Sequence, residues 1–210
     1  MNFQPTTEQN MLRESVARFM TGHCSQSDVR RWDRDGEFPE TLHRAMAEAG
    51  YPAMMVPEAY GGLGSSMSDC IIVYEELAKP SVDFATRLAL IAWGSMILSD
   101  FASEELKQEI LPRVATGDLK LSFSLTEPNS GSDAASLQTR ARRDGDDWVL
   151  TGQKLFSSGA DAKDNMIIVA VRTDASASKH RGISLFLVPN DLPNLTIRRL
   201  ETVGRKIVGL

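Results

Sequence analysis

The hydrophobic pattern of this chain changes its period near residue 118. Before that point, apolar residues recur every three to four positions, as they do on one face of a helix. From Leu119 onward they alternate with polar residues, as in half-buried strands. We find no internal repeat. A length of 210 residues allows one large or two modest domains. We therefore predict an α+β fold, with an all-α helical bundle at residues 1–118 followed by a mainly antiparallel, β-barrel-like domain at residues 119–210.

Five helices are expected in the first region. Thr6 or Thr7 can cap the first helix, Pro39 suits the first turn of the second, and Pro112 is expected to bend the last. The stretch from Asp83 to Phe101 is apolar almost all round, which predicts a helix at the centre of the bundle. The expected ranges are about 6–20, 39–50, 65–79, 83–101 and 103–117.

Six strands are expected in the second region. The run Asp144-Gly145-Asp146-Asp147 is typical of a hairpin turn between two of them. The expected ranges are 119–126, 137–142, 148–156, 166–172, 183–188 and 195–200.

Composition and charge exclude several classes of function. Hydrophobic residues make up 42% and charged residues 24% of the chain, as in a globular protein. A formal net charge of −5 argues against nucleic acid as a partner, because no surplus of cations is available to replace phosphate counterions. Cys24 and Cys70 match no metal or redox spacing, and the three histidines form no cluster with them, so no metal site is expected.

The same features suggest where the protein resides. Two scattered cysteines fit a reducing compartment, and the N-terminus has neither a basic segment nor a long apolar stretch, so no signal peptide is expected. The apolar stretch from Leu88 to Leu98 is too short to span a bilayer. We expect a cytoplasmic protein that makes no membrane contact.

A dense cluster of turn-forming residues follows the first expected strand. Leu121, Phe123 and Leu125 alternate with polar residues, and the chain then continues as Thr126-Glu127-Pro128-Asn129-Ser130-Gly131-Ser132-Asp133. Unpaired N–H groups at such a strand exit can face an anion or the carbonyl groups of a flat heterocycle. The pattern indicates either a turn that binds a ligand or a polar loop between two strands.

This run resembles the flavin-binding signature of the acyl-CoA dehydrogenase family. The later stretch Trp148-Val149-Leu150-Thr151-Gly152-Gln153-Lys154-Leu155-Phe156-Ser157-Ser158-Gly159-Ala160 resembles the family's strand that contacts the other side of the flavin, and residues 57–64 and 111–117 are also similar. Two positions depart from the pattern. The signature usually has Gly, Ala or Cys at Ser124, and many members have Trp at Phe156. The family's first two domains are an all-α domain and an orthogonal β-barrel-like domain, which matches the expected order.

The resemblance implies an FAD cofactor and the α,β-dehydrogenation of an acyl-CoA thioester, in which a carboxylate base takes the α-proton and the β-hydride passes to flavin N5. It places Leu125 and Thr126 at the pyrimidine edge of the flavin, Phe156 on the ring face, and Ser158 near N5. Ser132 would contact the phosphopantetheine arm of the substrate as well as the cofactor site. The implied cofactor-binding residues are Phe123, Leu125, Thr126, Ser132, Phe156, Ser157 and Ser158.

From the residues alone, ordinary structural roles stay open for these side chains. Thr126 could satisfy its own turn, Phe156 could be a core aromatic, Ser158 a loop hydroxyl, and Ser132 could cap a turn with Asp133. Glu127 is expected to fix its turn. The family's catalytic base comes from a C-terminal helical domain, so no residue of this chain is expected to be catalytic.

The resemblance also implies partners. These are the acyl-CoA substrate, electron-transfer flavoprotein or a similar acceptor, and either a homo-oligomer or a subunit that carries the C-terminal domain. Because residue 210 falls before the family's middle domain is complete, we expect a fragment, a truncated product or half of a split enzyme. Two alternatives remain: a non-catalytic half subunit of a heteromeric flavoprotein, and an acyl-CoA oxidase or flavin monooxygenase on the same scaffold.

Overall fold

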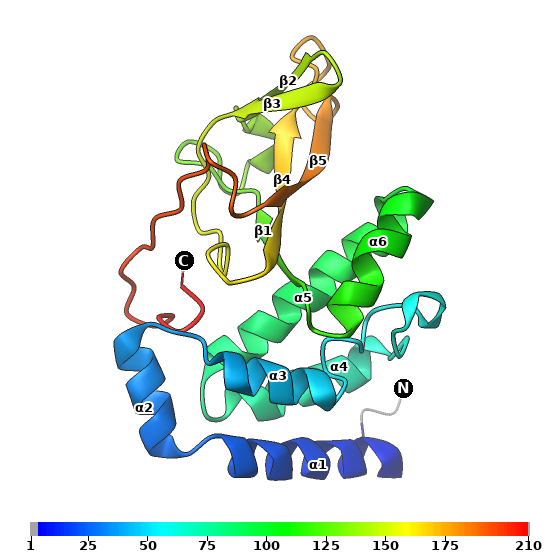
Figure 1. The fold of residues 1–210 in the computed structure, drawn as a ribbon, viewed down its shortest axis with the longest axis vertical. Helices are drawn as coiled ribbons and strands as arrows, with labels where there is room; N and C mark the ends of the chain where they lie inside the picture. The colour runs from blue at the N-terminus through cyan, green and yellow to red at the C-terminus, as the bar shows by residue number, and fades with distance from the viewer. Residues whose placement is uncertain (1–3, 210) are drawn as a thin grey trace.

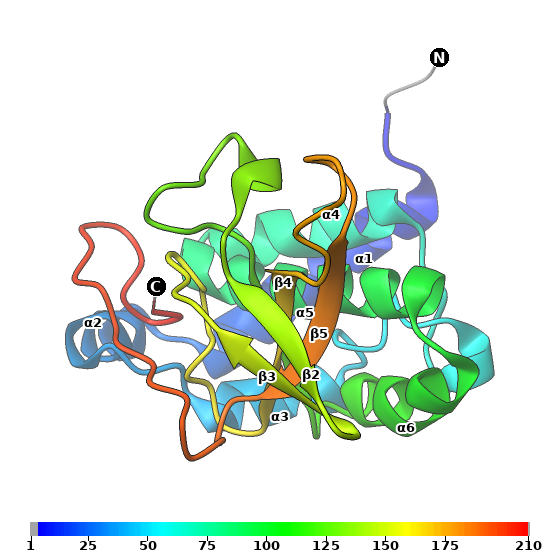
Figure 2. The ribbon, with the colours of Figure 1, turned by 90° about the horizontal axis from the view of Figure 1, so that it is seen from above.

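The computed structural model describes residues 4–209 and places a group of helices beneath a twisted sheet (Figure 1). Seen from above, the strands cross over the helices (Figure 2). The helices are α1 (Thr7–His23), α2 (Gln26–Asp35), α3 (Glu40–Glu48), η1 (Glu58–Tyr60), α4 (Met67–Ala78), α5 (Val82–Phe101), α6 (Glu104–Ala115) and η2 (Ala134–Ser136). The strands are β1 (Lys120–Ser124), β2 (Arg140–Asp144), β3 (Asp147–Thr151), β4 (Asn165–Arg172) and β5 (Ile183–Pro189).

Side-chain caps set the beginnings of most helices. Thr6 and Gln9 form a reciprocal capping box before α1, and serines cap α4, α5 and α6. The five predicted helices are confirmed, with Pro112 inside α6. The prediction missed α2, which Ser25 and Asp28 cap at its start and Gly36, at φ 67°, ends.

Helix α5 is the central helix of the molecule. It spans 20 residues, and about half of them are buried. By length and composition alone it could cross a membrane, because the helix is longer than the apolar stretch from Leu88 to Leu98 noted in the sequence. The apolar run reaches beyond Leu88 and Leu98, and 56% of its window is buried inside the protein, as in a core helix.

The sheet is mixed and open. Strand β4 pairs with β1 in parallel and with β5 in antiparallel orientation, while β2 and β3 form an antiparallel hairpin that meets β4 at Arg140 and Arg172. The predicted α+β class is confirmed, but the expected barrel is not closed. The parallel pairing of β1 with β4 requires a long crossover connection, and the segment that contains the β2–β3 hairpin supplies it.

One predicted strand is absent from the structure, and another ends earlier than predicted. Residues 195–200 alternate in polarity but form no strand, because no described segment pairs with them. The strand expected at residues 148–156 ends at Thr151, where Gly152 at φ 159° takes the chain out of the ladder.

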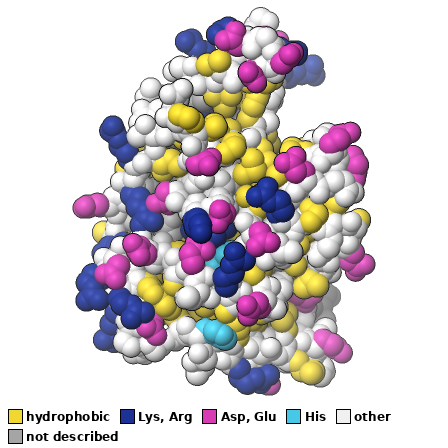
Figure 3. Space-filling view, in the orientation of Figure 1, with side chains coloured by type: hydrophobic (Ala, Val, Ile, Leu, Met, Phe, Trp, Pro, Cys, Tyr) yellow, Lys and Arg dark blue, Asp and Glu magenta, His cyan; other side chains and the backbone are white. Residues whose placement is uncertain are grey.

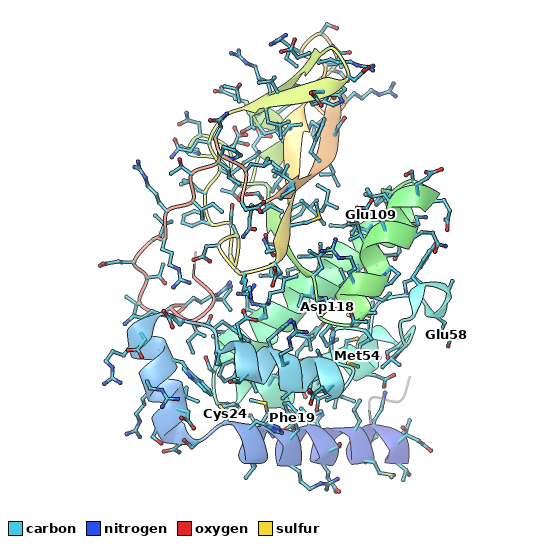
Figure 4. The ribbon with its side chains drawn as sticks, in the orientation of Figure 1. Phe19, Cys24, Met54, Glu58, Glu109 and Asp118 are labelled. Carbon is cyan, nitrogen blue, oxygen red and sulfur yellow. The ribbon has the colours of Figure 1, made fainter. Side chains whose placement is uncertain are left out.

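Two buried clusters connect the helices to the rest of the chain. The first lies among α1, α3, α4 and α5 and includes Ile207, although Ile207 lies far along the chain. The second joins α5 and α6 to β1 and β4, where Gly94 lets Leu121 approach the helix closely. Hydrophobic side chains gather between the sheet and α6 in Figure 3. Asp118 lies between the helices and the sheet (Figure 4). Phe19 and Cys24 lie near the C-terminal end of α1.

Candidate functional site

The fold brings the two flavin-like motifs side by side. The backbone N–H of Leu155 donates to the Thr126 carbonyl at 2.8 Å, and Lys154 Nζ donates to the Leu125 carbonyl at 3.1 Å. One residue earlier, the hydroxyls of Ser124 and Ser157 are hydrogen-bonded to each other. The exit of β1 and the segment after β3 are thus held together along three successive positions.

The Ser124–Ser157 pair explains one departure from the family signature. Ser124 is buried on the sheet face opposite Phe123, where an unpaired hydroxyl is costly. Ser157 supplies its partner. A hydroxyl at position 124 is therefore tolerated because position 157 carries a second one.

Glu127 anchors the turn after β1. Its carboxylate accepts hydrogen bonds from the backbone N–H groups of Gln138 at 2.6 Å and Thr139 at 2.9 Å, and from Lys154 Nζ at 2.8 Å. Burial would raise the pKa of this carboxyl, but the bonds from Lys154, Thr139 and Gln138 outweigh it and lower the pKa to about 2. The prediction that Glu127 fixes the turn is confirmed.

We name the contacts that join Leu125 and Thr126 to Lys154 and Leu155 the clasp. Thr126 presents two hydrogen-bond donors on the side of the clasp that faces away from Lys154. In a trans peptide the carbonyl of one residue and the N–H of the next point in opposite directions. Because the Leu125 carbonyl faces Lys154, the Thr126 N–H points away from that segment. Within residues 4–209, neither this N–H nor the Thr126 hydroxyl is engaged in a hydrogen bond. These two donors fit the carbonyl groups at the pyrimidine edge of a flavin.

Phe156 is held in an unusual conformation. Its φ of 58° lies in the left-handed region, which is a rare place for a bulky residue, and 57% of its side chain is exposed. Strain of this kind costs about 1–3 kcal/mol and persists where the surroundings over-determine it. An exposed ring held at this cost fits a stacking surface for a flat ligand.

The other predicted residues differ in accessibility. Phe123 is half-buried and packs against the cluster between helices and sheet, and Leu125 is also half-buried. Ser132 lies exposed in the turn after β1. Ser158 is buried, its hydroxyl accepts from Arg205 Nη1 at 3.4 Å, and its N–H donates to the Phe156 carbonyl at 3.0 Å.

A cavity of about 650 Å³ lies beside Phe156 and Ser157. It is lined by Ile167 and Val169 of β4, on the sheet face opposite the helices, and by residues 194–198 and Leu200. Thr126 and Ser132 do not line it. Of the predicted residues, Phe156 and Ser157 line the cavity, whereas Phe123 packs on the helix side of the sheet.

Sequence reasoning gave Lys154 no role, and it also missed Arg87. Lys154 is a lysine within an otherwise apolar and hydroxyl-rich motif, and Glu127 is the one carboxylate between Leu125 and Gly131. Arg87 is a charged residue within the apolar run of α5. In both cases, a charged residue within an otherwise apolar segment could have indicated a buried and structurally important side chain.

Comparison with known proteins agrees with this geometry. The model of the acyl-CoA dehydrogenase N-terminal domain matches residues 6–118, and that of the acyl-CoA dehydrogenase middle domain matches residues 122–209. The chain is 36% identical over 198 residues to the probable acyl-CoA dehydrogenase YngJ of Bacillus subtilis, covering 94% of this chain and 52% of that protein.

Solved structures give the same result. An acyl-CoA dehydrogenase from Geobacillus kaustophilus superposes with a TM-score of 0.88 at 32% identity, covering all of this chain and 55% of that one. A glutaryl-CoA dehydrogenase from Mycobacterium smegmatis in complex with FADH2 gives a TM-score of 0.87 at 28% identity, covering 98% of this chain and 51% of that one.

This chain thus spans about half the length of the relatives that it matches. Both matched domain models belong to one family, and together they cover the helices, the sheet and both halves of the clasp. The chain belongs to the acyl-CoA dehydrogenase family and carries its N-terminal and middle domains.

Proposed function

We propose that this chain is the N-terminal portion of an FAD-dependent acyl-CoA dehydrogenase. The observation that carries the proposal is the clasp between Leu125-Thr126 and Lys154-Leu155, which leaves both Thr126 donors unengaged beside an exposed Phe156 ring. When bound, FAD supplies the hydride acceptor for α,β-dehydrogenation of an acyl thioester.

In this proposal the chain orients the cofactor. The N–H and hydroxyl of Thr126 donate to the pyrimidine edge of the flavin, where electron density rises on reduction, so they favour the reduced form. Phe156 covers the ring face and excludes water. Ser132 binds the phosphopantetheine arm of the acyl-CoA, and the catalytic base comes from outside residues 1–210.

The exposed side of α5 supports a requirement for a further helical part. Trp93 is 55% and Phe101 79% exposed, and Val82 lies on the same side of the helix. We propose that the second half of an acyl-CoA dehydrogenase polypeptide covers this stripe, either in the same chain or in a partner subunit. Single exposed apolar residues are common, but a stripe along the central helix is typical of an interface.

The stripe gives a direct prediction for residues 1–210 alone. They should enhance the fluorescence of an apolar-surface dye, and the double variant Trp93→Gln, Phe101→Ser should reduce that signal by about half or more. Arg30→Gln, Arg34→Gln on α2 serves as the control, with no expected change. A monodisperse monomer without dye binding would contradict the proposed interface.

Activity tests the whole proposal. The chain should be produced together with the polypeptide that carries the third domain, and the complex examined for flavin absorbance that bleaches when acyl-CoA is added. Electron transfer to a dye acceptor or to electron-transfer flavoprotein completes the test. Lack of flavin in the complete complex would refute the proposal, whereas hydrogen peroxide formation from oxygen would indicate the oxidase alternative.

Removal of the Thr126 hydroxyl tests the role of this residue in cofactor binding. We expect Thr126→Val to weaken FAD binding by about three- to tenfold, because one hydrogen bond to the cofactor is lost while the shape is kept. Titration of the complete complex with FAD measures this. Thr21→Val, on α1, is the matched control. Equal affinities for wild type and Thr126→Val would remove Thr126 from the site.

Partners and location follow from the same proposal. We propose an acyl-CoA thioester as substrate, electron-transfer flavoprotein or a similar acceptor as electron partner, and the cytoplasm as the site of action. Assembly is either a homo-oligomer of the complete polypeptide or a pairing with a subunit carrying the third domain.

A further inference from the structure

Arg87 of α5 is a buried cation that forms no salt bridge within residues 4–209, where the nearby Glu40 and Asp161 pair with Lys120 and Arg199 instead. It is 2% exposed, and within the described residues its Nε and Nη1 atoms have no hydrogen-bond partner. Its guanidinium lies 5.1 Å from the ring centroid of Phe38. Burial lowers its pKa to about 10, opposed by Asp161 and Glu40, so the group is charged at neutral pH. A buried charge held in this way is costly and requires a reason.

The guanidinium lies directly against the turn that follows Ser158. A Cβ atom built on Gly159 would come within 2.7 Å of Arg87 Nη1 and 3.2 Å of its Cζ. Gly159 also has a φ of 70°, which side chains rarely adopt. Glycine at this position therefore allows both the backbone conformation and the contact with Arg87.

The same turn is also held by residues 205–209, which we name the C-terminal strap. The Gly159 N–H donates to the Gly209 carbonyl at 3.3 Å, and Arg205 contacts the Ser158 hydroxyl. The Ile207 N–H in turn donates to Asp83 Oδ2 at 2.9 Å. In Figure 1 the C-terminal end of the chain (red) returns to the helices beside α2 and α3.

Asp83 and Arg87 are one helical turn apart, so one face of α5 serves both contacts. Asp83 binds the strap and Arg87 contacts the turn, while the strap itself is hydrogen-bonded to Ser158 and Gly159 of the turn. The turn begins at Phe156, whose left-handed conformation requires outside support. The contacts with Arg87 and the strap provide that support from the helical part of the protein.

We propose that Arg87 is a positioning residue that holds the Phe156–Gly159 turn in the conformation that exposes the Phe156 ring for contact with the cofactor. An effect of Arg87 on FAD binding rests on the proposed function. The positioning itself is a property of this chain alone, and it can be measured without the cofactor.

Two independent changes should displace the same turn. Arg87→Met removes the guanidinium, and Gly159→Ala inserts a methyl group into its place. Hydrogen–deuterium exchange of a peptide covering residues 153–161 should become about tenfold faster in either variant, and the double variant should show little further change. Arg31→Met is the control, because Arg31 also lies over an aromatic ring, that of Trp32, but is exposed.

Arg87→Lys distinguishes positioning from simple packing and guards against loss of the fold in Arg87→Met. It keeps the charge but not the planar group, so exchange at residues 153–161 should fall between wild type and Arg87→Met. Faster exchange confined to α5 and Phe38, with residues 153–161 unchanged, would overturn the proposal. FAD titration of the complete complex is the second measurement, with about tenfold weaker binding expected for Arg87→Met. If wild type binds no FAD while the exchange pattern holds, the proposed function fails and the positioning role stands.

Discussion

Replacing Glu127 with glutamine is expected to lower the free energy of unfolding by about 3–5 kcal/mol, because it leaves Lys154 as an uncompensated buried cation. Glu127 is 7% exposed, and its two oxygens accept bonds from Lys154, Gln138 and Thr139. Urea unfolding followed by circular dichroism measures the loss. The same substitution should also loosen the clasp at Leu125 and Thr126, since Lys154 holds the Leu125 carbonyl.

The pH dependence of stability provides a second measurement at the same residue. The folded pKa of Glu127 is lowered from 4.5 to about 2, so its contribution is fully present above the unfolded value and is lost as pH falls toward the folded value. Wild type should therefore lose about 3 kcal/mol more than Glu127→Gln between about pH 5 and pH 2.

Glu75→Gln is the matched control for both measurements. Glu75 pairs with Arg13 at 2.9 Å, but its side chain is 54% exposed, so its loss should cost less than about 1 kcal/mol. If Glu127→Gln and Glu75→Gln were equally stable, the Glu127–Lys154 pair would not be the anchor of the turn.

The second large effect is expected at Gly62. A Cβ atom built there would lie 1.9 Å from the carbonyl oxygen of Val56 and 2.3 Å from its carbonyl carbon, so the backbone itself must move. Gly64 donates its N–H to the same carbonyl at 3.0 Å, and that bond would be disturbed. We expect Gly62→Ala to cost about 4 kcal/mol or more, measured as a shift of the urea midpoint.

Gly22→Ala offers the same substitution with the opposite expected sign. Among residues 4–209, nothing beyond the helix's own neighbouring backbone lies within 4 Å of a Cβ at this position of α1, and alanine favours a helix by about 1 kcal/mol over glycine. A small gain in stability at Gly22, together with a large loss at Gly62, would assign the effect to the contact with Val56. Similar changes in stability for Gly22→Ala and Gly62→Ala would exclude the contact with Val56 as the cause.

The elements that could be predicted from the sequence are those with a strong local pattern. Helix α5 is apolar along most of its length. Strands β4 and β5 carry apolar residues between turn formers, and both lie within one residue of their predicted ranges. Helix α2 was missed because most of its residues are polar and its apolar residues are few, so only the cap residues Ser25 and Gly36 marked it.

Features that depend on distant partners could not be predicted in the same way. Residues 195–200 have the alternation of a strand, but a strand forms only where another pairs with it. The motif residues Thr126 and Phe156 were found through resemblance. The contacts of Lys154 with the Leu125 carbonyl and of Arg87 with Gly159 were not found, because they form between segments far apart in the sequence.

The buried position of Ile207 has a consequence for how the protein acquires its structure during synthesis. The helices emerge from the ribosome first, yet their core includes Ile207, and Val208 beside it is also fully buried. At a synthesis rate of about 5–20 residues per second, Ile207 is added on the order of ten seconds after the helices are complete. During this interval the nascent chain exposes an unfilled hydrophobic site, which makes it a substrate for chaperones that act at the ribosome exit.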